Sequence, residues 1–241
     1  MAETVSKILQ PGRNCWRTEQ AERTAFLIDA KRYFEVLDRV LPQARRRILI
    51  VGWDFDSTMR LTPGGPAISD RLLKLVDANP QLEVHILIWR SSLVYAANHD
   101  IPLPIGSNWF DHPRIHYKLD AEHPIGGSHH QKIVVLDDKL AFVGGIDLTQ
   151  WRWDDCGHDA DCAERINPKG EAYDPVHDVQ ILVDGDAAAA VAELAHERWA
   201  DGTGETLKPL PAGLSRLWPM GVTPDLRDHE IAIARTRAEY K

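Results

Sequence analysis

The sequence predicts an α/β fold, in which a mostly parallel or mixed β-sheet carries helices on both faces. Short apolar runs typical of buried strands alternate with amphipathic segments of helical periodicity. The composition is that of an ordinary globular protein, with 44% hydrophobic and 27% charged residues. A chain of 241 residues can form one large domain or two modest ones.

A helix followed by a strand forms the first predicted unit. Over residues 24–44, apolar side chains recur at three- and four-residue spacing with charges opposite, which predicts an amphipathic helix. The next segment, RRRILIVGWDF, combines a basic cluster with an apolar run and predicts a buried strand that ends near Trp53 or Phe55. We interpret its three arginines as a solvated helix-to-strand junction, with phosphate binding as the alternative.

A second unit repeats this plan. ISDRLLKLVDA predicts a short helix, LEVHILIWR predicts a strand, and RIHYKL predicts another. The long connection between the two strands, from Ser91 to Pro113, is expected either to have a function or to cover a site.

The remaining elements divide the chain into two regions. Two strands around Asp137–Lys139 and an acidic loop from Asp154 to Pro175 precede the buried strand VHDVQILVDG and the helix DAAAAVAELAHERWADG. We predict a catalytic lobe over residues 1–206, and over 207–241 a proline-punctuated connector and the start of a second lobe that this sequence does not contain. From Ile231 the sequence resembles the beginning of a strand that has no partner left in the chain.

Charge and cysteine content limit the functional classes. The net charge of −8 disfavours a protein that grips nucleic acid, although a local basic groove stays possible. Three cysteines do not make a disulfide framework and indicate a reducing compartment. The sequence shows neither a secretory signal nor an apolar run long enough for a membrane span, so we expect a cytoplasmic protein whose contact with lipid is peripheral.

The segment GGSHHQKIVVLDDKLAFVGGIDLT, residues 126–149, holds the strongest chemical signal. In an extended chain His130 and Lys132 project from one face, because residues two apart share a side. An ammonium can hold the oxygens of a phosphoryl group while an imidazole attacks phosphorus or transfers a proton. His129 has the wrong parity to share this face, which favours a structural role.

The other polar and small residues of this segment support the pair. Asp137 has the opposite parity, and we expect it to hydrogen-bond backbone groups and fix the hairpin. Gly144 and Gly145 allow another group to approach the backbone closely, as where an anion meets main-chain N–H donors.

The string DDCGHDADC raises the alternative of a metal site. Cys156, His158 and Cys162 are competent ligands, but their spacing does not match the usual paired zinc pattern. We interpret the string as a solvated acidic loop.

Three tryptophans carry a second open alternative. They could line a pocket for acyl chains or a headgroup, although aromatic side chains more often fill cores. The three are Trp109, Trp151 and Trp153.

The segment HHQKIVVLDDKLAFVGGIDLT resembles the signature of the phospholipase D superfamily, His-x-Lys-x4-Asp followed six residues later by Gly-Gly or Gly-Ser. Flanking segments resemble the N-terminal half of bacterial, phospholipid-directed members: ARRRILIVGWDF, VHILIWR, HDVQILVDGDAAAAVAELAHERW and DLRDHEIAIARTRAEY. The resemblance covers nearly the whole chain and implies a phospholipase D-like lobe.

The resemblance also implies roles for single residues. His130 corresponds to the histidine that forms a phosphohistidine, Lys132 to a phosphate ligand, and Asp137 to the motif aspartate. Asp178 corresponds to a carboxylate that supports a catalytic histidine, for which a strand-entry hydrogen bond is the alternative.

Substrate contacts are expected from three further positions. These are Gly144, Gly145 and Asp147. Gly145 stands where many relatives have serine and Asp147 where many have asparagine, a variant that occurs in phospholipid-cleaving members.

The implied activity is phospholipid phosphodiester cleavage by hydrolysis or transphosphatidylation, without a cofactor or metal. One imidazole bonded to phosphorus cannot also protonate the leaving alkoxide, so a second histidine is required. No other histidine of the chain has lysine at plus two and aspartate at plus seven. We therefore expect a second motif-bearing lobe or a homodimer to complete the enzyme. The alternatives are an incomplete half-enzyme or assembly subunit and, less favoured, a single-motif nuclease acting as a homodimer.

Overall fold

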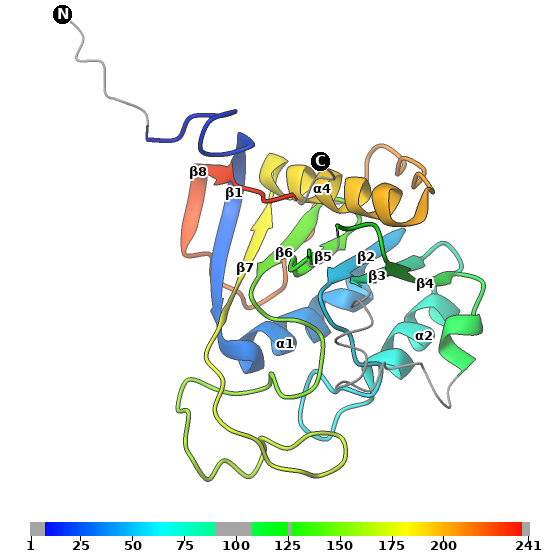
Figure 1. Ribbon diagram of the computed structural model, residues 1–241, viewed down its shortest axis with the longest axis vertical. Coiled ribbons are helices and arrows are strands. Elements are labelled where there is room, and N and C mark those ends of the chain that lie inside the picture. The colour runs from blue at the N-terminus through cyan, green and yellow to red at the C-terminus, as the bar shows by residue number, and fades with distance from the viewer. Residues whose placement is uncertain (1–7, 90–107, 125–126, 238–241) are drawn as a thin grey trace, which may run out of the picture.

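A computed structural model describes residues 8–89, 108–124 and 127–237 and has the predicted α/β fold. One eight-stranded sheet has the order β4-β3-β2-β5-β6-β7-β1-β8 (Figure 1). The strands are β1 Arg17–Ile28, β2 Arg47–Gly52, β3 Glu83–Trp89, β4 Ile115–Asp120, β5 Ile133–Leu136, β6 Leu140–Gly144, β7 Val179–Asp184 and β8 Leu226–Ile233. The helices are α1 Asp29–Val40, α2 Ile68–Ala78 and α4 Asp186–Thr203, with short 3-10 turns η1 Leu41–Gln43 and η2 Asn108–Asp111.

The sheet is mixed. Only β2 with β3 and β3 with β4 pair in parallel, and the pairs from β2 through β5, β6, β7 and β1 to β8 are antiparallel. The mixed form of the prediction is therefore confirmed and a mostly parallel sheet is wrong. The tight turn between β5 and β6 is one reason, because such a turn can join only antiparallel strands.

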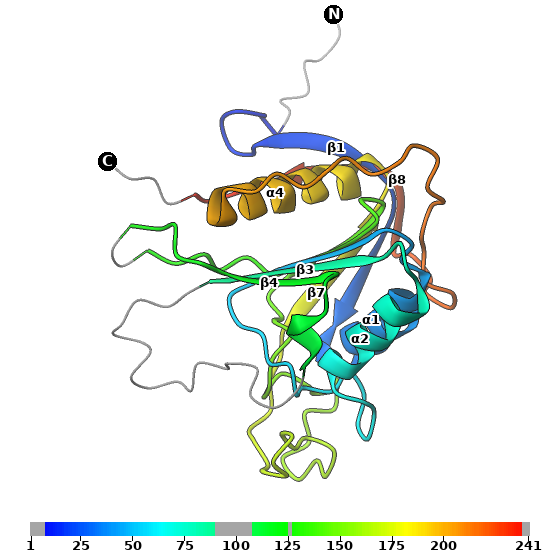
Figure 2. The ribbon, with the colours of Figure 1, turned by 90° about the vertical axis from the view of Figure 1, so that its right-hand side faces the viewer.

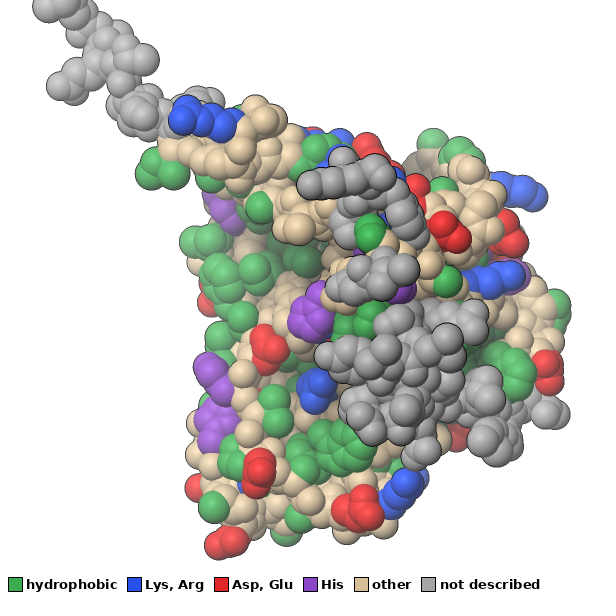
Figure 3. All heavy atoms as spheres, in the orientation of Figure 1, with side chains coloured by type: hydrophobic (Ala, Val, Ile, Leu, Met, Phe, Trp, Pro, Cys, Tyr) green, Lys and Arg blue, Asp and Glu red, His purple; other side chains and the backbone are tan. Residues whose placement is uncertain are grey.

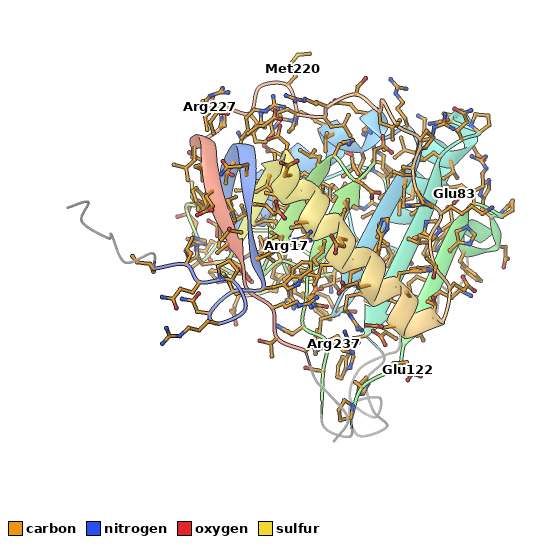
Figure 4. All side chains as sticks on the ribbon, turned by 90° about the horizontal axis from the view of Figure 1, so that it is seen from above. Arg17, Glu83, Glu122, Met220, Arg227 and Arg237 are labelled. Atoms are coloured by element: carbon orange, nitrogen blue, oxygen red, sulfur yellow. The ribbon has the colours of Figure 1, made fainter. Side chains whose placement is uncertain are left out.

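Helices cover both faces of the sheet. Figure 2 shows α1 and α2 together on one side and α4 on the other, and Figure 4 shows α4 crossing the strands. The α1 side carries the larger apolar cluster, whereas the α4 side is packed mainly by alanines and aliphatic residues. Strands β2 and β5 are buried along their whole length, as near-continuous apolar runs predict.

The predicted helix over residues 24–44 is wrong at its beginning. Residues up to Ile28 extend β1, which pairs with β7 on one side and β8 on the other, and α1 begins only at Asp29. The apolar residues of this stretch also alternate in burial, with Leu27 buried and Phe26 and Ile28 exposed. This stretch fits both the helical and the strand periodicity, and its pairing in the sheet makes it a strand.

The expectation that the strand near Ile231 lacks a partner is also wrong. Strand β8 pairs antiparallel with β1, from Arg17 opposite Ile233 to Thr24 opposite Leu226. This segment therefore belongs to the sheet of the lobe, although the boundary at residues 206 and 207 stays a prediction.

The long connection after β3 lies mostly outside the described residues. Its described end contains η2, where Trp109 is buried in the core. The acidic loop after β6 projects from the sheet and lies below α1 in both views (Figures 1 and 2). In the described part of the chain, the helices are too short or too polar to cross a bilayer.

Candidate active site

A buried ion pair forms the floor of the candidate site. Lys132 directly precedes β5, and Asp147 follows β6, so the hairpin brings the two side chains together. The Lys132 Nζ lies 2.9 Å from Asp147 Oδ2, and the two side chains are only 5% and 2% exposed. A buried ammonium needs such a partner, because an unpaired charge is costly to bury.

Asp147 is held in place by main-chain donors. Its Oδ1 accepts hydrogen bonds from the N–H groups of Trp53 (2.9 Å) and Asp54 (3.2 Å), just beyond the end of β2. Burial raises the pKa of the Asp147 carboxyl, while Lys132 and these donors oppose the rise. The Asp147 carboxylate therefore competes with any phosphate for the charge of Lys132.

His130 stands above this pair and is exposed. Its ring lies edge-on to Trp53 at 5.7 Å between centroids, and the Lys132 Nζ lies 5.8 Å from the same indole. The Lys132 ammonium also approaches the His130 carbonyl oxygen at 3.3 Å. The structure thus places His130 and Lys132 next to the same Trp53 indole, although β5 itself begins only at Ile133.

Trp53 is a site residue that the sequence reasoning missed. It stacks on Trp89 at 5.6 Å, so the ends of the parallel strands β2 and β3 together support the His130 ring. Its position directly after a buried strand was a usable signal, because sites in α/β sheets gather beyond the carboxyl ends of parallel strands.

Asp178, which directly precedes β7, lies against Gly145, which directly follows β6. A Cβ built on Gly145 would come within 2.1 Å of Asp178 Oδ1, so only glycine admits the carboxylate in this position. Asp178 Oδ1 accepts a hydrogen bond from the Val179 N–H at 2.7 Å. Among the described residues no hydrogen bond joins Asp178 to His130, so its predicted support of a histidine stays a prediction.

Asp137 serves the backbone, as its parity predicts. Its carboxylate accepts hydrogen bonds of 2.7–2.8 Å from the N–H groups of Arg45, Arg46 and Arg47. Asp137 is buried and adopts a positive φ of 52° in the β5–β6 turn, a conformation that aspartate tolerates. These contacts agree with a role in fixing the hairpin, and its motif role stays a prediction.

Gln180 is a second residue that the sequence reasoning missed. It is fully buried in β7, where its Oε1 accepts a hydrogen bond from the Ile146 N–H and its Nε2 approaches the Lys132 carbonyl at 3.5 Å. A Cβ on Gly144 would lie 2.3 Å from the Val179 carbonyl oxygen, which explains the glycine there by close backbone packing. A polar residue inside the apolar run QILV was the available signal.

Other candidates lie elsewhere. The His129 ring contacts the Glu122 carbonyl at 3.1 Å, as a structural role predicts. Trp109 and Trp153 are buried core residues, whereas Trp151 is exposed. Cys156 and Cys162 are free thiols, and neither belongs to a group of metal-competent residues in the described chain.

A cavity of about 720 Å³ opens beside His130 and Lys132. It extends between α4, the sheet and β8, and most of its walls are aliphatic, including Val143, Ile181, Val191 and Ile233. Figure 3 shows hydrophobic side chains around a hollow on this face, with histidine and basic side chains below it. The polar motif therefore lies at one end of an apolar groove.

Fold and site together define a class: a mixed α/β lobe that carries one His-x-Lys-x4-Asp motif beside an apolar groove. Curated relatives agree with that class. The chain is 28% identical over 211 residues to "Phospholipase D C" of Dictyostelium discoideum, covering 71% of this chain and 12% of the relative. It is 28% identical over 145 residues to "Phospholipase D1" of Homo sapiens, covering 54% of this chain and 13% of the relative.

These similarities support a member of the phospholipase D superfamily. It spans only 12% and 17% of the length of the two Dictyostelium relatives. No family model matches the chain.

Two solved structures are similar to part of this chain. Nuc of Salmonella typhimurium, described as a phospholipase D family member, has a TM-score of 0.45 and 15% identity over 77% of this chain and 97% of its own. Phosphatidylserine synthase of Haemophilus influenzae has a TM-score of 0.49 and 16% identity over 73% of this chain and 36% of its own.

Proposed function

We propose that the chain is one lobe of a phospholipid phosphodiesterase of the phospholipase D type, and that a second motif completes its site. The observation that carries the proposal is the exposed His130 imidazole above the buried Lys132–Asp147 pair, at the end of an apolar groove. A nucleophile, a phosphate-binding cation and an apolar surface are what a phospholipid requires.

In the first step, an imidazole nitrogen of His130 attacks phosphorus and the bond from phosphorus to the headgroup oxygen breaks. The Lys132 ammonium stabilises charge on the non-bridging oxygens. The leaving alkoxide takes a proton from the histidine of the second motif. That histidine then removes a proton from water or an alcohol, whose oxygen attacks phosphorus while the bond from phosphorus to His130 breaks.

The second motif comes from another lobe or from a second copy of this chain. The proposal needs it because, in the described part of the chain, the His130 imidazole makes no hydrogen bond to a group that could act as the acid. The exposure of His130 leaves room for a facing histidine. An assembly subunit that contributes half a site is the second candidate, favoured by the same exposure.

A phospholipid is preferred to a nucleic acid as substrate for two reasons. The groove beside the motif is mostly aliphatic, and the chain carries a net charge of −8, which opposes binding of a polyanion. The exposed apolar side chains of Phe26, Ile28 and Leu226 lie on strands that border the groove and support peripheral contact with a lipid surface. A cytoplasmic location is part of the same proposal.

The direct test measures choline release from phosphatidylcholine vesicles, with and without a primary alcohol, over a range of protein concentrations. If a second copy completes the site, activity per chain rises as dimers form, and light scattering follows the same transition. His130→Ala should lower turnover at least about 10³-fold, as loss of a nucleophile does. His129→Gln is the matched control and should keep turnover, because among the described residues its ring contacts the Glu122 carbonyl, Asp120 and His123 and not the Lys132–Asp147 pair.

Three results would contradict parts of the proposal. Turnover that persists in His130→Ala removes His130 as nucleophile. Activity from a strict monomer removes the need for a second motif. Cleavage of nucleic acid without any cleavage of phospholipid would show that the substrate is a nucleic acid and not a phospholipid.

A further inference from the structure

Two histidines and a buried aspartate meet at the beginning of α1, apart from the Lys132–Asp147 pair. One ligand atom from each of Asp29, His158 and His177 lies within 4.8 Å of the others. Asp29 begins α1, His158 comes from the acidic loop, and His177 precedes β7. The set therefore joins three segments that are distant in the sequence.

Asp29 is 1% exposed, yet its Oδ2 has no hydrogen-bond donor in the described part of the chain. That oxygen faces His158 Nε2 at 3.3 Å without hydrogen-bond geometry. The other oxygen, Oδ1, lies 2.7 Å from His177 Nδ1.

The neighbouring cationic side chains already have other partners, because Lys31 pairs with Asp155 and Arg165 with Asp154. A buried carboxylate oxygen with no donor indicates a missing cation or proton.

Asp154 sets the orientation of the His158 ring. This fully buried carboxylate lies 3.0 Å from His158 Nδ1, and it also accepts hydrogen bonds from Arg165 and from the Val176 N–H. When His158 Nδ1–H donates to Asp154, the lone pair of Nε2 faces Asp29. An imidazole held by a carboxylate through one nitrogen and directed through the other is the usual arrangement of a metal-ligating histidine.

We propose that Asp29, His158 and His177 bind one divalent transition-metal ion, for which Zn²⁺ is the best match. Two imidazoles and one carboxylate are ligands that Zn²⁺ accepts, with water in the fourth position. In a tetrahedral site with bonds of about 2.0–2.1 Å, neighbouring ligand atoms lie roughly 3.3 Å apart. The His158 Nε2 to Asp29 Oδ2 distance of 3.3 Å agrees with that spacing. His177 Nδ1–H donates a 2.7 Å hydrogen bond to Asp29 Oδ1, and binding of the ion would replace this proton. The His177 side chain is 70% exposed, which leaves a path for the ion.

The ion would connect the acidic loop to the sheet beside the motif. The Asp29 N–H donates to the Asp178 carbonyl at 2.9 Å, and the Asp178 N–H approaches Asp29 Oδ1 at 3.3 Å. Asp178 in turn packs against Gly145. The ion therefore holds the acidic loop and Asp178 in position, and it has no part in phosphodiester chemistry.

The test titrates Zn²⁺ into chelator-treated full-length protein by calorimetry and measures Co²⁺ absorption as a second readout. One ion should bind per chain, and Co²⁺ should give the intense visible bands of tetrahedral coordination. Zn²⁺ at about a hundred times its Kd should raise the Tm by roughly 5–10 °C. His177→Ala removes an exposed ligand without disturbing the core and should weaken binding at least tenfold, while His158→Gln should abolish the Co²⁺ bands. Asp154→Asn should weaken binding about 10–100-fold.

His116→Gln is the matched control, because Glu83, His85 and His116 form the second metal-competent group in the described chain. If Zn²⁺ still binds to His116→Gln but not to His177→Ala, the ion lies in the site formed by Asp29, His158 and His177. The opposite pattern overturns the assignment. Absence of saturable binding, with a Tm unaffected by Zn²⁺, also overturns it and leaves a protonated His158 between Asp29 and Asp154, in agreement with the way Asp154 raises the pKa of His158.

Discussion

The two ends of the β5–β6 hairpin each hold a buried aspartate, and the two carboxylates have different partners. At one end Asp147 faces the Lys132 ammonium, and at the other Asp137 accepts hydrogen bonds from three consecutive backbone N–H groups. Both side chains are about 2% exposed. Burial therefore does not distinguish a site residue from an architectural one, whereas the nature of the partner does.

The largest effect is expected at the architectural end. Asp137→Ala leaves the N–H groups of Arg45, Arg46 and Arg47 without acceptors and places alanine at a positive φ. We expect a loss of about 3–5 kcal/mol in the free energy of unfolding, measured by urea denaturation. Asp138→Ala is the control, since this half-buried neighbour has a similar φ but, among the described residues, its carboxylate contacts the His196 and Arg47 side chains and no run of backbone N–H groups. It should cost below about 1 kcal/mol. Equal losses would show that the backbone hydrogen bonds of Asp137 do not provide its stabilising effect.

A loss nearly as large is expected at the other end. Lys132→Met leaves the Asp147 carboxylate buried without its cation, which costs about 3 kcal/mol at neutral pH. Burial raises the pKa of Asp147, so the carboxyl binds a proton as the pH falls and the penalty shrinks. Urea denaturation at neutral and mildly acidic pH measures the change. A loss independent of pH would mean that Asp147 is not the source of the penalty.

Gly144, the last residue of β6, and Gly145, which follows it, separate the effect of backbone packing from that of placing Asp178. Gly144→Ala would bring a Cβ within 2.3 Å of a backbone carbonyl, and Gly145→Ala within 2.1 Å of the Asp178 carboxylate. Because a side chain can rotate and a sheet backbone cannot, Gly144→Ala should cost about 2–3 kcal/mol and Gly145→Ala about 1 kcal/mol. Thermal unfolding compares the two, and the reverse order would show that Asp178 is held rigidly.

The smallest effect concerns charge alone. Asp147→Asn keeps an acceptor for the N–H groups of Trp53 and Asp54 but removes the negative charge beside Lys132. The affinity for inorganic phosphate should rise about tenfold, or about 1.4 kcal/mol, as measured by calorimetry at low salt. Unchanged or weaker binding would indicate that the carboxylate helps to orient Lys132 more than it competes with phosphate.

Local patterns predicted much of this fold, because burial and spacing leave direct marks on the sequence. The helix ISDRLLKLVDA coincides with α2, and the hairpin around Asp137 is observed as β5 and β6. Two predictions failed where sequence-distant pairing decides the structure. Strand β1 takes residues that also fit a helix, and β8 finds its partner in β1 at the other end of the described chain.

The candidate site was likewise predicted only in part. Spacing selected His130 and Lys132, and parity anticipated the backbone contacts of Asp137. Nothing in the spacing brings Trp53 under the imidazole or Asp29 next to His158, because those contacts depend on strand order and on the path of a loop.

The pairing of β8 with β1 also governs how the sheet meets its surroundings. An unpaired strand edge is a template for addition of another chain, and β1 would expose such an edge along most of its length without β8. Strand β8 itself carries Arg227, Asp228 and Glu230, and charges of this kind discourage further strand addition. Because β1 is synthesised long before β8, the growing chain passes through a stage in which that edge is open, and self-association is most favoured during that interval.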